Sequence, residues 1–443
     1  MIETNVKIIN ELKEFLKYFI ENEEKRKIII KNEKDFRRKR KLSAEKIILF
    51  LINLSRKTLT VEIKEFFDIL ATPELRCTKS AFTQQRKKLS YLFFKLWNLY
   101  LADCFYFFYE DNIKRWNGHR LLGVDGSTLY LPNTKSLAEY FGKQENQHGG
   151  KVMARTLFIY DVLNEITIYS ELHPIKISET AILNSVIEKI PDDAIAIYDR
   201  GFSSYKNMFL HIFQEREKKF VMRCSIVPNK TIINFVKSGK RNQIVKLTPN
   251  DDAIAQLYKM KYIVNKETTI KVRLIRIELD DGNVEVLATN LYESKKYPTN
   301  KFKKLYFQRW KIETEINYLK NLYQIELFSG YAVESIYQDF YATMFTFNLH
   351  GILIKQCEID VININRNRKY EYKINRTVTL GFIKGDLINL FINNSPKTIL
   401  EKMKNEFIKE LVPIRNGRKY ERLKKVKRLN GKYQTLTNYK QAI

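Results

Sequence analysis

The sequence predicts a mixed α/β protein with helical regions at both ends, and three observations lead to this prediction. Apolar residues recur at three- and four-residue spacing through about residue 115, as at Ile8, Leu12, Leu16 and Phe19, which is the helical period. From about residue 118, short apolar runs alternate with helical stretches, as expected for a mixed sheet covered by helices. Hydrophobic residues make up 44% of the chain, which allows large cores and excludes wholesale disorder.

The charge predicts a polyanionic partner. The 443 residues include 78 Lys and Arg against 50 Asp and Glu, a net charge of +28. Such a chain attracts DNA, RNA or an anionic membrane, and the simplest alternative is a solvated basic surface without a specific ligand. The longest uncharged apolar stretch, Phe340–Ile354, is shorter than the roughly 20 residues that span a membrane. We therefore expect nucleic acid, and no membrane, as the partner.

The cysteines indicate a reducing compartment. Cys77, Cys104, Cys224 and Cys357 lie far apart and form no C-x-x-C pair. Neither a zinc ribbon nor a disulfide framework is indicated by such spacing. We expect a cytoplasmic protein.

Two basic clusters mark the N-terminal helical region. The segment 25–41 holds ten Lys and Arg residues, and the segment 78–89 reads Thr-Lys-Ser-Ala-Phe-Thr-Gln-Gln-Arg-Lys-Lys-Leu. Thr78 or Ser80 can cap a short helix in the second segment. A capped helix with polar and basic residues on one face suits a groove-reading element, so we expect Arg86 and Lys87 to contact DNA. A plain solvated helix is the alternative.

The central part predicts a sheet interrupted by an insertion. Strands are expected at 121–124, 156–162, 166–172, 194–198 and 220–222, with helices at 179–190 and 204–217. The segment 226–298 is strand-rich and carries turn signals such as Asp280-Asp281-Gly282-Asn283. We interpret it as an insertion, because helical patterning returns at 299–323 and 333–356.

Two aspartates end predicted strands. Asp125 closes Leu-Leu-Gly-Val-Asp and precedes Gly126, and Asp199 closes Ala-Ile-Ala-Ile-Tyr-Asp and precedes Arg200-Gly201. An acid there is costly unless it is paired or bound to a metal, and the carboxyl ends of strands are where α/β sheets place their sites. One Asp-Gly pair would indicate only a turn. Two in one domain favour a shared site.

A third acid lies on the helix expected at 299–323. On a continuous helix, Tyr306, Arg309, Glu313 and Lys320 fall within about 60° of arc, beside a buried apolar stripe. Glu315 points the opposite way and is expected to be solvated. The alternative reading is a surface Arg–Glu pair at i, i+4, worth a few tenths of a kcal/mol.

These residues resemble a known family. Tyr-x2-Arg-x3-Glu-x6-Lys at Tyr306, Arg309, Glu313 and Lys320 is similar to the signature of DDE transposases of the insertion-sequence-four group. Further similar segments are 36–42, 80–86, 125–128, 149–164, 199–202 and 289–291, so the resemblance covers most of residues 36–356. The order Asp, Asp, strand-rich insertion, Glu also matches.

The resemblance implies a ribonuclease-H-like core at 118–225 and 299–356, interrupted by the insertion at 226–298. The helical region 1–117 would bind DNA. Beyond the resemblance, the composition predicts that the region 357–443 is helical and basic. Its segment 413–443 holds ten Lys and Arg, one acid and interleaved tyrosines, which favours DNA contact or dimerisation over a disordered tail.

The resemblance also implies the chemistry. Asp125, Asp199 and Glu313 would hold two Mg²⁺ ions, for which Mn²⁺ could substitute, since hard carboxylate oxygens suit these ions. Tyr306, Arg309, Lys320 and Arg200 would contact DNA. The enzyme would cut both transposon ends, through hairpin intermediates, and join the 3′ ends to target DNA as a homodimer in a synaptic complex.

Three alternatives stay open from the sequence. A Mg²⁺-dependent nuclease or resolvase would use the same core without strand transfer. A DNA-binding derivative without catalysis would retain the fold. A glycosidase with paired carboxylates is formally possible, but the charge of +28 argues against it.

Overall fold

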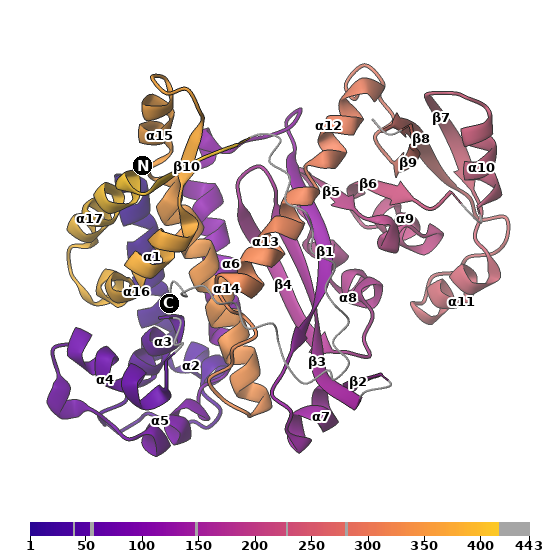
Figure 1. Ribbon diagram of the computed structural model, residues 1–443. Helices are drawn as coiled ribbons and strands as arrows, with labels where there is room; N and C mark the ends of the chain where they lie inside the picture. The colour runs from indigo at the N-terminus through magenta and orange to yellow at the C-terminus, as the bar shows by residue number, and fades with distance from the viewer. Residues whose placement is uncertain (39, 54–56, 147–148, 227–228, 280–281, 416–443) are drawn as a thin grey trace. The chain divides into compact units, whose positions relative to one another are not determined.

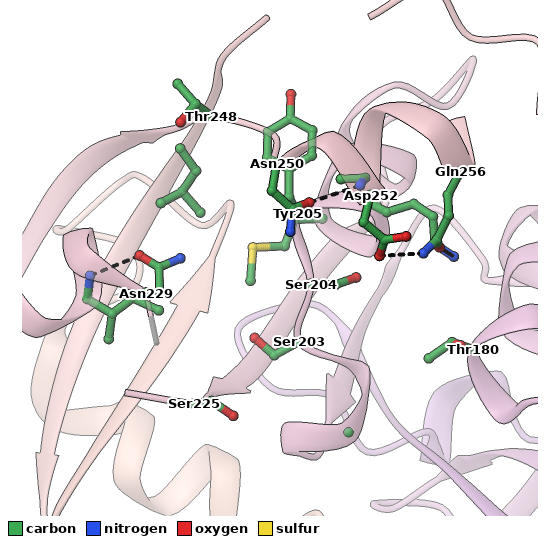
Figure 2. Close-up of a pocket in the computed structure, with 16 residues that line it drawn as sticks. Thr180, Ser203, Ser204, Tyr205, Ser225, Asn229, Thr248, Asn250, Asp252 and Gln256 are labelled. Carbon is green, nitrogen blue, oxygen red and sulfur yellow. Dashed lines mark hydrogen bonds between the residues drawn. The ribbon is translucent and has the colours of Figure 1, made fainter. Parts of the chain in front are cut away.

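The computed structural model describes residues 1–38, 40–53, 57–146, 149–226, 229–279 and 282–415 (Figure 1). The chain divides into two compact units. The first comprises Met1–Asn112, Leu129–Ala154 and the chain from Asn317 onward, and the second comprises Ile113–Thr128 and Arg155–Ile316. The basic segment expected to bind DNA at 413–443 lies almost wholly outside the described residues.

The first unit is built mainly from helices, which confirms the helical pattern of the N-terminal region. Its helices are α1 (Ile2–Glu21), α2 (Glu23–Ile29), α3 (Ala44–Ile52), α4 (Leu59–Ile69), α5 (Lys79–Arg86), α6 (Leu92–Phe108), α7 (Lys135–Phe141), α14 (Val333–Lys355), α15 (Glu358–Asn365), α16 (Arg376–Ile392) and α17 (Pro396–Lys409). Its short strands are β2 (Lys143–Asn146), β10 (Tyr372–Ile374) and β11 (Leu411–Pro413). The Thr78 side chain accepts a hydrogen bond from the Ala81 N–H, so the predicted cap of α5 is confirmed.

Helix α14 forms the centre of this unit. It packs against α3, α6, α16 and α17, and most of its side chains are buried on every face. Its buried polar groups find partners: Thr346 donates to the Ile52 carbonyl over 2.7 Å, and Asn348 donates to Asn98 over 2.8 Å. Within the described residues, neither α14 nor any other helix combines the length with the hydropathy of a membrane span.

The second unit contains most of the large sheet. Its elements are β1 (Arg120–Tyr130), β3 (Gly149–Asp161), β4 (Ile166–Pro174), α8 (Glu179–Val186), β5 (Ala194–Tyr198), α9 (Tyr205–Ile212), β6 (Lys219–Cys224), α10 (Lys230–Lys237), β7 (Asn242–Leu247), α11 (Asp251–Lys259), β8 (Ile270–Glu278), β9 (Val284–Thr289), α12 (Phe302–Phe307) and α13 (Trp310–Asn321). The ends of β1, β3 and α13 extend into the first unit. Each of the five predicted strands lies in or overlaps β1, β3, β4, β5 or β6.

The pairing of the strands brings distant parts of the chain to one edge. The order is β2-β3-β1-β5-β6-β9-β8-β7, and β4 pairs with β3. Strands β1, β5 and β6 are parallel, with Val124 opposite Tyr198 and Tyr198 opposite Met222. Residues that directly follow these positions therefore lie side by side on neighbouring strands, at the level where β5 ends.

The segment 226–298 is part of this same sheet. It supplies β7, β8 and β9, and β9 pairs antiparallel with β6 (Figure 1). It also contains the helices α10 and α11, which the strand-rich reading did not predict.

The helix predicted over 299–323 is interrupted. The expectation that Tyr306, Arg309, Glu313 and Lys320 share one face of a continuous helix is therefore wrong. Helix α12 ends at Phe307 and α13 begins at Trp310, with three-residue turns between them: the N–H groups of Gln308 and Arg309 bond to the carbonyls of Leu305 and Tyr306. Tyr306 and Glu313 therefore belong to separate helices. Only Glu313 and Lys320 share one.

Candidate active site

The two aspartates lie on neighbouring strands, but only Asp199 follows the end of its strand; β1 continues to Tyr130, so the strand end predicted at Asp125 is wrong. Asp125 and Asp199 follow the opposed pair Val124 and Tyr198 of the parallel strands β1 and β5. The Gly126 N–H donates to Asp125 Oδ1 over 2.9 Å and orients that carboxylate within β1. Burial raises the pKa of Asp125 to about 6, and the nearby charges of Glu179 and Glu313 add to the rise.

Close packing of α13 on β1 brings in the third acid. A Cβ on Gly123 would lie 3.2 Å from the Ile312 Cβ, so the absence of a side chain lets this helix approach the strand. Gly123 and Asp125 lie on the same face of β1, since side chains alternate along a strand. Glu313 follows Ile312, and its charge acts on Asp125.

Arg309 provides positive charge to all three acids. Its side chain is 2% exposed, and its Nη1 lies 2.8 Å from Glu313 Oε1. Its charge also lowers the pKa values of Asp125 and Asp199, although burial of each carboxyl acts in the opposite direction. The DNA contact expected for Arg309 does not fit this burial. It would require the guanidinium to leave these carboxylates.

A second arginine holds Asp199 from the neighbouring strand. Arg223 on β6 places Nη2 2.6 Å from Asp199 Oδ1 and Nη1 2.6 Å from Glu285 Oε1 of β9. Burial raises the pKa of Asp199, but the Arg200 N–H bond and the charges of Arg223 and Arg309 outweigh it, and the net pKa lies below the ordinary value. The sequence analysis missed Arg223 and Glu285. Its one signal was an arginine in the apolar run Phe-Val-Met-Arg-Cys.

A fourth carboxylate lies beside Asp125. Glu179 at the start of α8 lies against Gly126, where a Cβ would come within 2.2 Å of its Cδ. Arg155 on β3 pairs with Glu179 over 3.0 Å. Arg155 lies in the family-like segment 149–164, whereas no local pattern in the sequence distinguishes Glu179.

The comparisons with known proteins follow this geometry. Residues 116–349, more than half of the chain, match the family model of the transposase DDE domain. The chain belongs to the transposase DDE domain family.

This DDE domain also resembles individual proteins. A 93-residue stretch is 29% identical to "Putative transposase InsZ" of Escherichia coli (strain K12), covering 20% of this chain and 31% of that protein. The chain thus spans less than a third of that relative. Among solved structures, it is similar to the cryo-EM structure of the piggyBac transposase synaptic complex with hairpin DNA, with a TM-score of 0.37 and 10% identity over 84% of this chain and 75% of that one.

The remaining signature residues of the DDE domain have different surroundings. Tyr306 is buried, and its hydroxyl lies 3.5 Å from Asp199 Oδ1. Arg200 is exposed beside Asp199. Lys320 is half-buried on the part of α13 that belongs to the first unit, where burial lowers its pKa.

Two surface assignments are wrong. Arg86 is 3% exposed and donates to Gln338, Ser329, the Ser335 carbonyl and Asp339 over 2.6–3.0 Å, so its donors face the interior of the first unit and not DNA. Lys87 beside it is exposed. Glu315 is 7% exposed, not solvated.

The donor set of the DDE domain suits a divalent cation, although its arrangement is not that of a metal site. Hard carboxylate oxygens on Asp125, Asp199 and Glu313 are the ligands that Mg²⁺ prefers. In the part of the chain that the structure describes, however, no three His, Cys, Asp or Glu side chains are arranged to hold a metal. Arginines contact two of these acids, so a cation would have to replace Arg223 at Asp199 and Arg309 at Glu313.

Proposed function

We propose that the protein is a DNA transposase of the insertion-sequence-four group that cuts transposon ends and joins their 3′ ends to target DNA by cut and paste. The proposal is supported by the side-by-side position of Asp125 and Asp199 next to the paired residues of β1 and β5, and by the charge of Glu313 acting on Asp125, in a chain of the transposase DDE domain family. The net charge of +28 suits duplex DNA as the partner.

We assign a ribonuclease-H-like core to this sheet. The strand order β4-β3-β1-β5-β6, with β5 and β6 parallel to β1, supports the assignment. The interruption between β6 and α12 by the segment 226–298 agrees with the expected insertion. The domain limits 1–117, 118–225 with 299–356, 226–298 and 357–443 remain our proposal.

The catalytic role follows from the carboxylates. Asp125, Asp199 and Glu313 would hold two Mg²⁺ ions, or Mn²⁺, which supply a Lewis acid and lower the pKa of bound water. Arg200 lies exposed beside Asp199 and is placed to meet a phosphate, and Tyr306 would hold the Asp199 carboxylate from the other side. No protein nucleophile is then needed.

The assembled enzyme would be a homodimer in a synaptic complex with two transposon ends. Lys87 and Lys320 would contact the DNA backbone. Hairpin ends are the proposed intermediates, because excision by cut and paste requires the second strand to be cut as well, and attack of the freed 3′-hydroxyl on the opposite strand would cut it while forming a hairpin.

The test measures cleavage and joining separately. Asp125→Asn, Asp199→Asn and Glu313→Gln are each expected to abolish cleavage of a duplex that carries the element's own end sequence, while gel-shift binding persists. Glu188→Gln, which changes an exposed acid outside the site, serves as the control and should cleave normally. Normal cleavage by any of the three site variants would contradict the assignment. Wild-type cleavage without joined products would show a nuclease instead.

A further inference from the structure

We propose that Arg223 and Glu285 act together as positioning residues for Asp199: Arg223 holds the Asp199 carboxylate until a divalent cation takes its place, and Glu285 then retains the released guanidinium. The inference rests on the proposed function. It concerns two residues that the sequence signature does not include, one of them in the segment 226–298.

The three side chains form a line across adjacent strands. Asp199 follows β5, Arg223 lies on β6 and Glu285 lies on β9, and these strands are neighbours in the sheet. Because Tyr198 lies opposite Met222, the next residues Asp199 and Arg223 face each other. The guanidinium uses a different Nη for each acid, with both contacts at 2.6 Å. A planar, forked cation is the side chain that can bridge two carboxylates in this way.

Partial burial makes the second acid necessary. The side chains of Arg223 and Glu285 are 21% and 15% exposed, compared with 35% for Asp199. A guanidinium at this depth that lost its partner would carry a desolvation cost. Glu285 removes that cost when a cation displaces Arg223 from Asp199, because the pair between Arg223 and Glu285 survives. Glu285 thereby makes it easier for a cation to displace Arg223 from the Asp199 carboxylate.

A purely structural cross-strand ion pair is the competing explanation. It predicts that changes at either residue lower stability in the same direction and leave cation affinity unchanged. The positioning role predicts opposite effects on cation affinity. Without Arg223 the cation no longer competes with that guanidinium for Asp199, and without Glu285 the guanidinium binds Asp199 more persistently.

The experiment measures Mn²⁺ binding to the full chain without DNA, by calorimetry and by the electron paramagnetic resonance signal of free Mn²⁺. We expect Arg223→Ala to tighten Mn²⁺ binding by about three- to tenfold and Glu285→Gln to weaken it by a similar factor. Glu278→Gln, an exposed change on β8 whose partner is Arg276, is the matched control and should leave the affinity unchanged.

Two further variants separate positioning from simple charge. Arg223→Lys keeps the charge but cannot bridge both acids, so its Mn²⁺ affinity should differ from that of the wild type; an identical affinity would overturn the proposal. In the Arg223→Ala background, Glu285→Gln should have little further effect. Additive effects of the two changes would mean that Glu285 acts by charge alone, and would also overturn it.

Failure of the proposed function has a different outcome. If wild-type protein bound no Mn²⁺ that depends on Asp125, Asp199 and Glu313, both the metal chemistry and this inference would be wrong. If Mn²⁺ binding depended on the three acids but not on Arg223 and Glu285, only the inference would fail. Thermal unfolding of each variant verifies that the conservative changes leave the protein folded.

Discussion

Ile312 on α13 occupies the space beside Gly123 on β1 that a larger residue would need. A Cβ on Gly123 would lie 3.2 Å and 3.3 Å from the Ile312 Cβ and Cγ2, and 3.1 Å from Val162 Cγ1. Lys311 fixes the same turn of the helix by donating to the Val162 carbonyl over 2.9 Å. The distance between Glu313 and Asp125 therefore depends on a glycine that has no chemistry of its own.

We predict that Gly123→Ala lowers both stability and cleavage. The added methyl must displace Ile312 or Val162 by a few tenths of an ångström, and such overpacking costs about 1–3 kcal/mol. The displacement also moves Glu313 away from Asp125. Urea unfolding and end cleavage measure the two effects. Gly385→Ala, where a Cβ meets nothing within 4 Å, is the control and should not lose stability. Wild-type cleavage by Gly123→Ala would show that the close approach is dispensable.

Gly126→Ala should act through Glu179. The new Cβ would overlap the Glu179 carboxylate, which must then swing away and give up its 3.0 Å contact with Arg155. We expect a lower unfolding temperature for Gly126→Ala, and partial recovery when Glu179→Ala makes room. Thermal unfolding of the single and double variants tests this coupling. If Gly126→Ala lowered the unfolding temperature equally with Glu179 and with Glu179→Ala, the clash would not involve the Glu179 side chain.

Asp125 should make the metal-free protein less stable as the pH rises. Its pKa in the folded protein is about 6 against an ordinary value of 3.8, so folding favours the protonated form. Below pH 4 the contribution of the protonated Asp125 to the free energy of unfolding is fully present. That contribution is lost as the pH rises through 6.

Asp125→Asn removes that loss, and is expected to raise the free energy of unfolding at pH 7.5 by up to about 3 kcal/mol. The two proteins should differ much less at pH 4. Urea titrations with EDTA at both pH values make the comparison. Parallel stability curves for the two proteins would contradict the assigned burial of Asp125.

Two adjacent residues on the N-terminal basic helix should behave oppositely. Arg86→Ala removes the ion pair between Arg86 and Asp339 in the interior of the first unit, and we expect a loss of about 3–5 kcal/mol of stability. Lys87→Ala should leave stability unchanged and reduce the salt dependence of DNA binding by about one unit of slope. Unfolding curves and binding at several salt concentrations distinguish them. Stable Arg86→Ala protein with weakened DNA binding would restore the surface role first expected for Arg86.

Local sequence was sufficient to select the two aspartates, because each directly follows an apolar run, although the turn expected after Asp125 is strand in the structure. Local sequence could not predict the roles of Arg223 and Glu285. They are 62 residues apart, and their contact depends on the pairing of β6 with β9. No local sequence pattern at either residue indicates that the two are in contact.

The prediction that the signature residues share one helix face was wrong for a related reason. It placed Tyr306, Arg309 and Glu313 on one face by assuming a continuous helix, whereas tight turns at Gln308 and Arg309 separate α12 from α13. No proline or glycine marks that break. The spacing of the three residues was informative about the family, while the geometry that it implied was not.

The pairing of β9 with β6 limits how far the chain could be shortened. Excising residues 226–298 would strip β6 of the neighbour that bonds to Val221 through Cys224, and would leave a bare strand edge flanked by buried apolar side chains. An unprotected edge of this kind recruits other strands, so a shortened chain would self-associate before it could serve as a minimal enzyme. Any attempt to shorten the protein should therefore spare β9, which seals the sheet that carries the acids.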